Sequence, residues 1–191
     1  MGGIIDVFRS GAWLTRERMR MVAFALLATS LIGVGYLIAT SDGLNDRLGR
    51  PLGIDFSNVY AAGTYVLDGQ PTAPFDPARQ FAREQAIFGT TATPFYGWYY
   101  RPFFLGLAAL LALMPYGLAL WQGVTLVLYL LSIRAIVAAS SPSPLRGRVK
   151  KEWLLLALAF PAVFVNLGQA HNGSLTAALI GAALCQLDRW P

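Results

Sequence analysis

The chain has 191 residues, of which 55% are apolar and only 13% charged, and it carries a net charge of +5. This balance excludes an ordinary soluble domain, in which charged residues are about twice as frequent. Residues 21–40 and 102–133 contain no charged side chain, and residues 153–187 contain only His171. Because a spanning helix needs roughly 20 apolar residues, the sequence predicts an all-α polytopic membrane protein with at least three spans.

Basic residues lie beside the apolar runs rather than on a soluble amphipathic face. They form two clusters, one before the first run and one before the last: Arg9, Arg16, Arg18 and Arg20, then Arg146, Arg148, Lys150 and Lys151. The positive-inside rule predicts that both flanks, residues 1–20 and 140–152, are cytoplasmic. This placement explains the positive charge by topology and gives no indication of nucleic acid as a partner.

The first span is predicted at residues 21–40. Residues 41–101 then form a large external segment with five basic and six acidic side chains, so no charge bias holds it inside. A connection of this length is usually functional or locally folded. We therefore expect the segment to carry short helices and functional residues.

Two short interfacial helices are predicted in this external segment. The first occupies about residues 58–68, with Ser57 as its N-cap. The second occupies about residues 77–88, between Asp76 as N-cap and Gly89 after its end. Both are expected to lie along the membrane surface.

Residues 102–139 are apolar but are interrupted at Pro115 and Gly117. The piece before Pro115 is only about 20 Å long as a helix. Either both pieces span the membrane, or the first piece is a half-helix, or one kinked span covers the whole region. A half-helix or a kinked span is favoured, because two full spans would place residues 140–152 outside, against the charge rule.

Residues 153–187 predict two spanning helices separated by a polar turn at residues 166–173. In the favoured topology this turn lies on the same side as the external segment. Gly173, Ala177 and Gly181 recur every four residues along the last helix. Such a stripe of small residues is typical of close helix packing in lipid.

Asp55 is the first candidate for chemistry. It follows the first span by about 15 residues and is flanked by aromatic side chains. A carboxylate held near a membrane surface beside such rings is partly desolvated, which raises its basicity and suits a general base. A solvated loop aspartate or a helix cap is the ordinary alternative.

The chain has one cysteine, Cys185, and one histidine, His171. These numbers exclude a disulfide framework and a multi-histidine metal site built from this chain alone. We expect no metal and no cofactor. Cys185 lies in an apolar helix, where a small buried side chain is the simplest interpretation.

Several short motifs follow one another in a fixed order: Asp55-Phe56, Tyr60-Ala61-Ala62-Gly63, Leu67-Asp68-Gly69, Phe75-Asp76-Pro77, Tyr99-Tyr100-Arg101-Pro102, Met114-Pro115, Trp121, and Gly168-Gln169 with Asn172. In this order they resemble the N-terminal half of the GT-C membrane glycosyltransferases. The resemblance is to glycosyltransferase family 87 and its polyprenyl-phosphate mannosyltransferase-like members. It extends over about residues 20–187.

The resemblance implies a GT-C-like N-terminal module with a large external first loop, in a multi-pass protein of the bacterial inner (plasma) membrane whose N-terminus is cytoplasmic. The implied activity is hexosyl transfer, mannose being expected. The sugar passes from a polyprenyl-phosphate donor to the hydroxyl of a lipid or glycan acceptor on the external face, with inversion. Asp55 is the implied catalytic base, and the membrane lipids are further partners.

Six further residues are expected to bind substrate: Tyr60, Tyr100, Arg101, Gln169, His171 and Asn172. Arg101 is placed to stabilise the leaving phosphate, although it stands where the family pattern has proline. An interface arginine whose side chain snorkels is its ordinary alternative. For Gln169 and His171 the alternative is a polar helix turn, and for the tyrosines it is membrane anchoring.

Other function classes stay open at this point. Family members are longer, so the expected protein is a glycosyltransferase or an N-terminal fragment of one. The alternative is a non-catalytic membrane subunit or an inactive fragment, and the sequence does not separate these two. A transporter half would be favoured by ionisable residues inside the spans. Arg134 and His171 instead lie near predicted span ends, which counts against that class.

Overall fold

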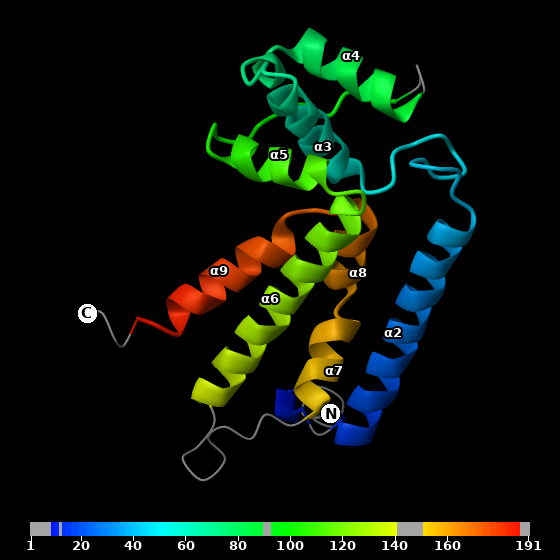
Figure 1. Ribbon diagram of the computed structural model, residues 1–191. Helices are drawn as coiled ribbons and strands as arrows, with labels where there is room; N and C mark the ends of the chain where they lie inside the picture. Colours follow the sequence, from blue (N-terminus) through cyan, green and yellow to red (C-terminus); the bar gives the residue numbers. More distant parts are fainter. Residues whose placement is uncertain (1–8, 12, 90–92, 141–150, 188–191) are drawn as a thin grey trace.

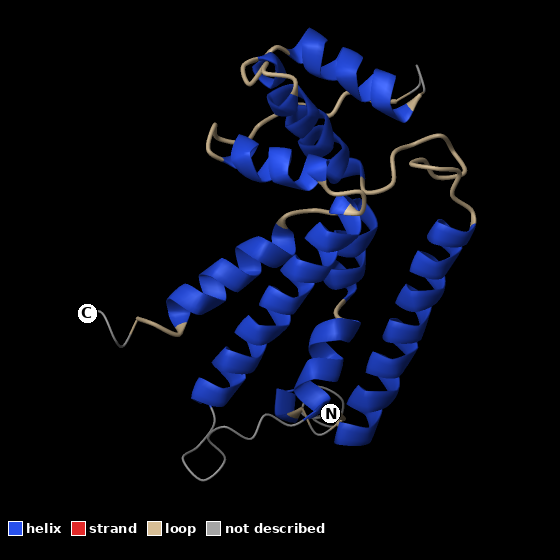
Figure 2. Cartoon of the chain, viewed as in Figure 1, coloured by secondary structure: helices blue, strands red, loops and turns tan. Residues whose placement is uncertain are grey.

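The computed structural model describes residues 9–11, 13–89, 93–140 and 151–187. Over these ranges every regular element is a helix, and extended pairing is limited to two isolated bridges. Figure 2 shows helices of different lengths joined by loops, with no strand drawn. The all-α class predicted from hydropathy is confirmed.

The helices form two layers (Figure 1). Three short helices, α3, α4 and α5, lie together at one end of the molecule, and the remaining helices extend away from them toward the other end. The upper layer consists of α3 (Ile54–Leu67), η1 (Ala73–Phe75), α4 (Pro77–Phe88) and α5 (Phe104–Leu113). The lower layer consists of α2 (Arg16–Ala39), α6 (Gly117–Ser140), α7 (Lys151–Ala159), α8 (Pro161–Gln169) and α9 (Gly173–Leu184).

Two helices of the lower layer are long and apolar enough to cross a membrane, α2 and the Gly117–Ala139 part of α6. A third span is possible if α7 and α8 count as one broken helix, since 53° separates their directions. Two or three candidate spans within the described residues agree with a polytopic membrane protein. The basic loop expected at residues 140–152 lies mostly outside the described residues.

The break between α7 and α8 occurs at Phe160 and Pro161, and the sequence interpretation did not foresee it. Phe160 is extended, with φ −65° and ψ 123°, and Pro161 starts α8 at its first position. A proline inside a helix removes one backbone hydrogen bond and its ring clashes with the preceding turn. Residues 153–187 therefore contain three helices rather than the two that were expected.

α5 has only 10 residues, about 15 Å of helix, whereas the hydrocarbon core of a bilayer is about 30 Å thick. It does not run along α6 but lies across the upper layer against α3 (Figure 1). The chain turns at Met114, which is extended, before α6 begins at Gly117.

α3 begins four residues earlier than expected, at Ile54 rather than at about residue 58. Gly53, in the left-handed region with φ 66°, provides the N-cap instead of Ser57. The Ser57 hydroxyl donates to the Ile54 carbonyl inside the first turn. As a consequence, Asp55 lies within the first turn of a helix and not in the loop before it.

α4 has the ends that its sequence predicted. The Asp76 side chain accepts hydrogen bonds from the backbone N–H groups of Ala78 and Arg79. Gly89 ends the helix in the left-handed region, with φ 66°. This cap and this glycine fix the two ends of α4.

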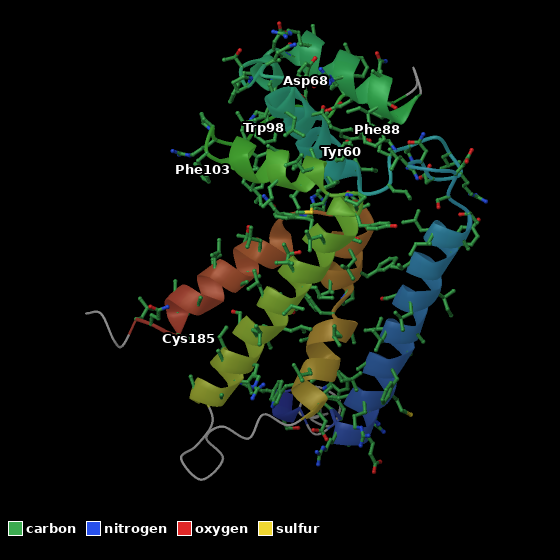
Figure 3. The ribbon with its side chains drawn as sticks, in the orientation of Figure 1. Tyr60, Asp68, Phe88, Trp98, Phe103 and Cys185 are labelled. Carbon is green, nitrogen blue, oxygen red and sulfur yellow. The ribbon has the colours of Figure 1, made fainter. Side chains whose placement is uncertain are left out.

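Small residues of α3 allow it to lie directly on α5. Ala61 and Ala62 are fully buried, and a Cβ built at Gly63 would collide with the backbone carbonyl of Ala108 in α5. The core continues toward α6 through buried apolar side chains, among them Trp98, and Tyr60 is partly buried against the same cluster. Figure 3 labels both residues. The Tyr60-Ala61-Ala62-Gly63 motif thus has a packing role.

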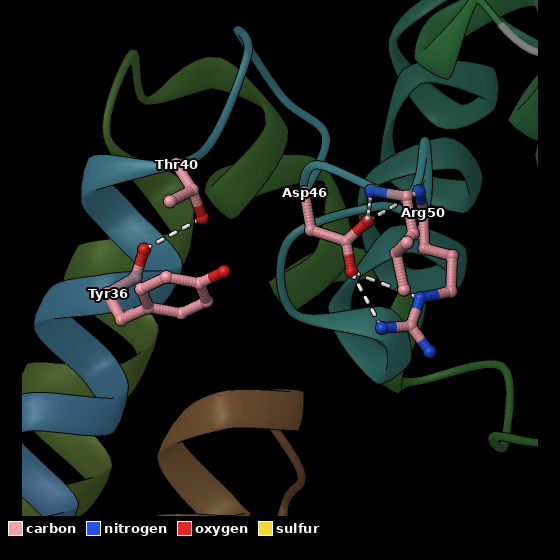
Figure 4. A network of polar contacts seen from close by, with 5 residues as sticks. Tyr36, Thr40, Asp46 and Arg50 are labelled. Carbon is pink, nitrogen blue, oxygen red and sulfur yellow. Dashed lines mark hydrogen bonds and ion pairs between the residues drawn. The ribbon is translucent and has the colours of Figure 1, made fainter.

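The loop between α2 and α3 is held by one carboxylate. Oδ1 of Asp46 accepts from the backbone N–H groups of Leu48 and Arg50, and Oδ2 accepts from the Arg50 guanidinium (Figure 4). Burial alone would raise the pKa of Asp46, but these hydrogen bonds outweigh it and hold the pKa below its ordinary value. These hydrogen bonds fix the conformation of the loop that precedes Gly53.

Candidate active site

Oδ2 of the Asp55 carboxylate and Nδ1 of the His171 imidazole are in direct contact. Asp55 lies in the first turn of α3, and His171 lies in the turn between α8 and α9. Their side chains are 32% and 40% exposed, so the pair is anchored in the protein yet open to solvent. Two residues that the sequence singled out separately are thus brought together.

The turn that carries His171 is fixed by backbone geometry. Ala170 has φ 54°, a left-handed conformation that is uncommon for a residue other than glycine. Its carbonyl accepts a hydrogen bond from Nε1 of Trp121 in α6, and the backbone N–H of His171 donates to the Asn166 carbonyl at 3.1 Å. The turn also packs closely against Gly53 at the start of α3, because a Cβ at Gly53 would collide with Ala170.

A cavity of about 330 Å³ opens beside Asp55. Two residues of α3, Asp55 and Asn58, form one wall. The rest of the lining comes from the segment before α5, through Phe95, Tyr96, Gly97, Tyr99 and Tyr100. We call this cavity the Asp55 cleft and residues 95–100 its aromatic wall.

Buried polar side chains fasten the aromatic wall to α3 and α4. Glu84 accepts a hydrogen bond from the Tyr96 N–H at 3.1 Å, and the Asn58 side-chain amide donates to the Gly97 carbonyl at 3.1 Å. The Gln80 amide completes the network by donating to the Asn58 carbonyl at 3.1 Å and to Glu84 at 3.0 Å. None of these three side chains was identified from the sequence.

Glu84 is fully buried, and this burial raises the pKa of its carboxyl group to about 7. The hydrogen bonds from the Tyr96 N–H and the Gln80 amide act in the opposite direction, since they stabilise the ionised form, but they are the smaller effect. Glu84 therefore changes its charge near neutral pH. Its spacing of four residues from Gln80 is a signal that the sequence contains, but the same spacing is common on solvated helix faces.

Stacked aromatic rings connect the wall to α6. Trp98 lies 5.0 Å from Tyr100, Tyr100 stacks on Phe104 at 4.6 Å, and Phe104 meets Trp121 edge-on at 6.1 Å, all measured between ring centroids. Because Trp121 also bonds the Ala170 carbonyl, this column connects the wall with the turn that carries His171. Burial raises the pKa of Tyr100, so its hydroxyl stays protonated and can donate a hydrogen bond.

The other residues predicted to bind substrate lie in different places. Tyr100 lines the Asp55 cleft, whereas Tyr60 lines a separate apolar cavity of about 480 Å³ on another face of α3. Arg101, Gln169 and Asn172 are exposed. Among the described residues, no hydrogen bond or ion pair joins Tyr60 or these three to Asp55. The structure thus groups Asp55, His171 and Tyr100 and leaves the other four apart.

The comparison with protein families gives one match. The model of Glycosyltransferase family 87 matches residues 98–191, which include Trp121, the His171 turn and the Tyr99-Tyr100-Arg101-Pro102 motif. Asp55 and the motifs before Trp98 lie outside the matched range. No curated protein and no solved structure matches the chain.

Proposed function

We propose that the protein is a glycosyltransferase like those of family 87, whose model matches residues 98–191. In this proposal it transfers a hexose, with mannose as the first candidate, from a polyprenyl phosphate to an acceptor hydroxyl on a lipid or glycan. The observation that carries this proposal is the contact of the Asp55 carboxylate with the His171 imidazole, beside a cleft that Asp55 lines together with aromatic side chains. The site lies where the upper layer joins the apolar helices, as a donor with a lipid tail requires.

In the proposed reaction, Asp55 is the general base. Its carboxylate takes the proton of the acceptor hydroxyl while that oxygen forms a bond to the anomeric carbon of the sugar. The bond between this carbon and the phosphate oxygen breaks, and its electron pair leaves with the polyprenyl phosphate. Attack from the face opposite the phosphate inverts the configuration at the anomeric carbon.

His171 supports this role by orienting the carboxylate. Its Nδ1 meets Oδ2 of Asp55, which leaves Oδ1 as the oxygen available to the acceptor. A carboxylate that is already oriented in this way loses less conformational entropy when the acceptor binds. Such orientation of reacting groups is a large part of enzymatic rate enhancement. Tyr100, whose hydroxyl stays protonated, is suited to donate a hydrogen bond to a sugar oxygen in the cleft.

The donor's lipid part has a suitable place beside the same helix. The apolar cavity of about 480 Å³ is lined by side chains from the end of α2, the following loop, α3 and the start of α6. Its walls include Ile38, Leu52, Phe56, Tyr60 and Leu118. An isoprenoid chain lying there would hold its phosphate near the N-terminus of α3, where backbone N–H groups favour an anion.

We place the site on the external face of the bacterial plasma membrane, with the N-terminus in the cytoplasm. The support is the arrangement of charge: the start of α2 carries Arg16, Arg18 and Arg20, and Arg16 pairs with Glu152 at the start of α7. These basic helix ends lie at the opposite end of the molecule from α3, α4 and α5 (Figure 1). By the positive-inside rule the basic end faces the cytoplasm.

The test is sugar transfer by membranes that contain the protein, with labelled mannosyl polyprenyl phosphate as donor and the glucosyl compound as a second donor. Asp55→Asn should lower the transfer rate about a hundredfold or more, because the general base is lost. Asp42→Asn is the matched control, since it makes the same chemical change at an exposed aspartate. NMR of the product then reports the anomeric configuration, which must be opposite to that of the donor.

Two results would overturn the proposal. One is a folded native chain that transfers neither sugar, and the other is transfer that Asp55→Asn leaves unchanged. Transfer from the glucosyl donor alone would keep the enzyme class and Asp55 but would replace mannose as the sugar.

A further inference from the structure

The aromatic wall of the Asp55 cleft has no regular secondary structure of its own. Residues 95–99 belong to neither a helix nor a strand, and the segment ends in a bend at Tyr100 before α5. Such a segment cannot satisfy its peptide groups through helical hydrogen bonds, so other groups must bind them. What holds the wall therefore sets the width and shape of the cleft.

Two consecutive residues of the wall are held by two side chains from different helices. Glu84 of α4 accepts from the Tyr96 N–H, and Asn58 of α3 donates to the Gly97 carbonyl. Glu84 is fully buried and Asn58 is 8% exposed, so water does not compete freely with either bond. Burial makes these bonds stronger and makes their loss more costly.

The two side chains belong to one network. The amide of Gln80, also fully buried, donates both to Glu84 and to the Asn58 carbonyl, and so connects α4 to α3. One residue before Tyr96 in the chain, Phe95 meets Phe81 of α4 edge-on, with 5.8 Å between ring centroids. The wall is thus attached to α4 at two neighbouring positions.

Asn58 also connects the wall to the base. It lies three residues after Asp55 on α3, and residues at this spacing are on the same helix face. Both residues line the cleft. The helix face that presents the carboxylate therefore also binds the aromatic wall, through Asn58.

We propose that Glu84 and Asn58 are positioning residues that clamp the backbone of Tyr96 and Gly97, and that this clamp holds the aromatic wall at the distance from Asp55 that the substrate requires. The clamp itself is independent of the chemistry in the cleft. Its effect on substrate binding rests on the proposed function. Glu84 does not line the cleft, so it can influence the substrate only through the groups that it binds, the Tyr96 N–H and the Gln80 amide.

The clamp is tested by hydrogen exchange of the backbone amides, measured by mass spectrometry on the whole chain in detergent. Glu84→Ala removes the acceptor for the Tyr96 N–H, so exchange in the peptide that covers residues 93–100 should become about tenfold faster or more. Exchange in α2 and α6 should stay as in the native chain. Glu84→Gln keeps an acceptor oxygen and should restore most of the protection.

Glu17→Gln is the matched control, because it changes an exposed glutamate of α2 and should leave exchange at residues 93–100 unchanged. If Glu84→Ala does not fold, Asn58→Ala tests the same clamp from its other side. Equal acceleration in all helices would show a general structural role and overturn the proposal. Unchanged exchange at residues 93–100 would overturn it as well.

Kinetics test the consequence for the substrate. Glu84→Ala should raise KM about tenfold with a smaller change in kcat, because a loosened wall weakens binding while Asp55 keeps its place. Glu84→Gln should restore KM, and a KM that Glu84→Ala leaves unchanged would show that the wall does not position the substrate. A native chain that transfers no sugar would overturn the proposed function, and the exchange measurement would still decide on the clamp.

Discussion

Nδ1 of His171 meets Oδ2 of Asp55 and so joins the turn after α8 to the first turn of α3. The imidazole touches the carboxylate, and the carboxylate lines the cleft. His171 itself is not among the cleft-lining residues. This geometry suggests that His171 acts through Asp55 rather than on the substrate.

A double-mutant cycle tests this order of action. His171→Ala should lower transfer about tenfold, less than Asp55→Asn, because the base remains but loses its orientation. The double variant should be no slower than Asp55→Asn alone, since residues that act as a unit are not additive. Rates measured under single-turnover conditions check this, and losses that multiply would show that His171 contacts the substrate independently.

The contact between α3 and α5 predicts a strong effect at Gly63. Gly63→Ala would place a methyl group against the Ala108 carbonyl. This carbonyl belongs to the backbone of α5, which cannot move aside as a flexible side chain can. We expect a loss of about 2 kcal/mol or more in the free energy of unfolding. It would be seen as a lower melting temperature in detergent.

Gly106→Ala is the matched control for that variant. Gly106 lies in α5, and a Cβ there meets no atom within 4 Å. The substitution should be neutral or stabilise the helix by up to about 1 kcal/mol. Equal melting temperatures for Gly63→Ala and Gly106→Ala would contradict the close approach of α3 to α5.

The all-α class was predictable because long apolar runs leave few alternatives. The pairing of Asp55 with His171 was not, although both residues had been singled out. It depends on Ala170 adopting a left-handed conformation, and alanine gives no sequence signal for that. The start of α3 was predicted too late because serine is a common N-cap, so Ser57 was chosen as the cap. In the structure Gly53 is the N-cap.

The polar network behind the cleft was overlooked for a different physical reason. Gln80 and Glu84 lie on a short helix with a polar composition, and polar helix residues usually face water. Here both are fully buried, because the aromatic wall and α3 cover that face. Such burial depends on tertiary contacts between α3, α4 and residues 95–100, which no local pattern contains.

The loop before α3 predicts a stability effect at Asp46. Asp46→Asn removes the negative charge that accepts two backbone N–H groups and the Arg50 guanidinium. An asparagine offers one acceptor oxygen, so we expect a loss of about 1 to 3 kcal/mol. Arg50→Gln, which removes only the guanidinium, should cost less. Thermal unfolding of both variants at neutral pH checks this order, and a larger loss for Arg50→Gln would contradict it.

Glu84 predicts how stability depends on pH. Its carboxyl has a pKa of about 7 in the folded chain, against an ordinary value of 4.5. Between these two values the folded state keeps a proton that the unfolded state has released, so the free energy of unfolding falls as pH rises, and the fall ends above about pH 7. At 1.36 kcal/mol per pKa unit, the whole effect is at most about 3 kcal/mol.

Glu84→Gln isolates this contribution, because glutamine carries no titrating proton and all other groups are shared with the native chain. The native chain should lose stability relative to Glu84→Gln as pH is raised from about 5 to about 8, and the difference should then stay constant. Melting temperatures in detergent across this range measure it. A difference that does not change with pH would mean that Glu84 is ionised in the folded state at no cost, which its complete burial argues against.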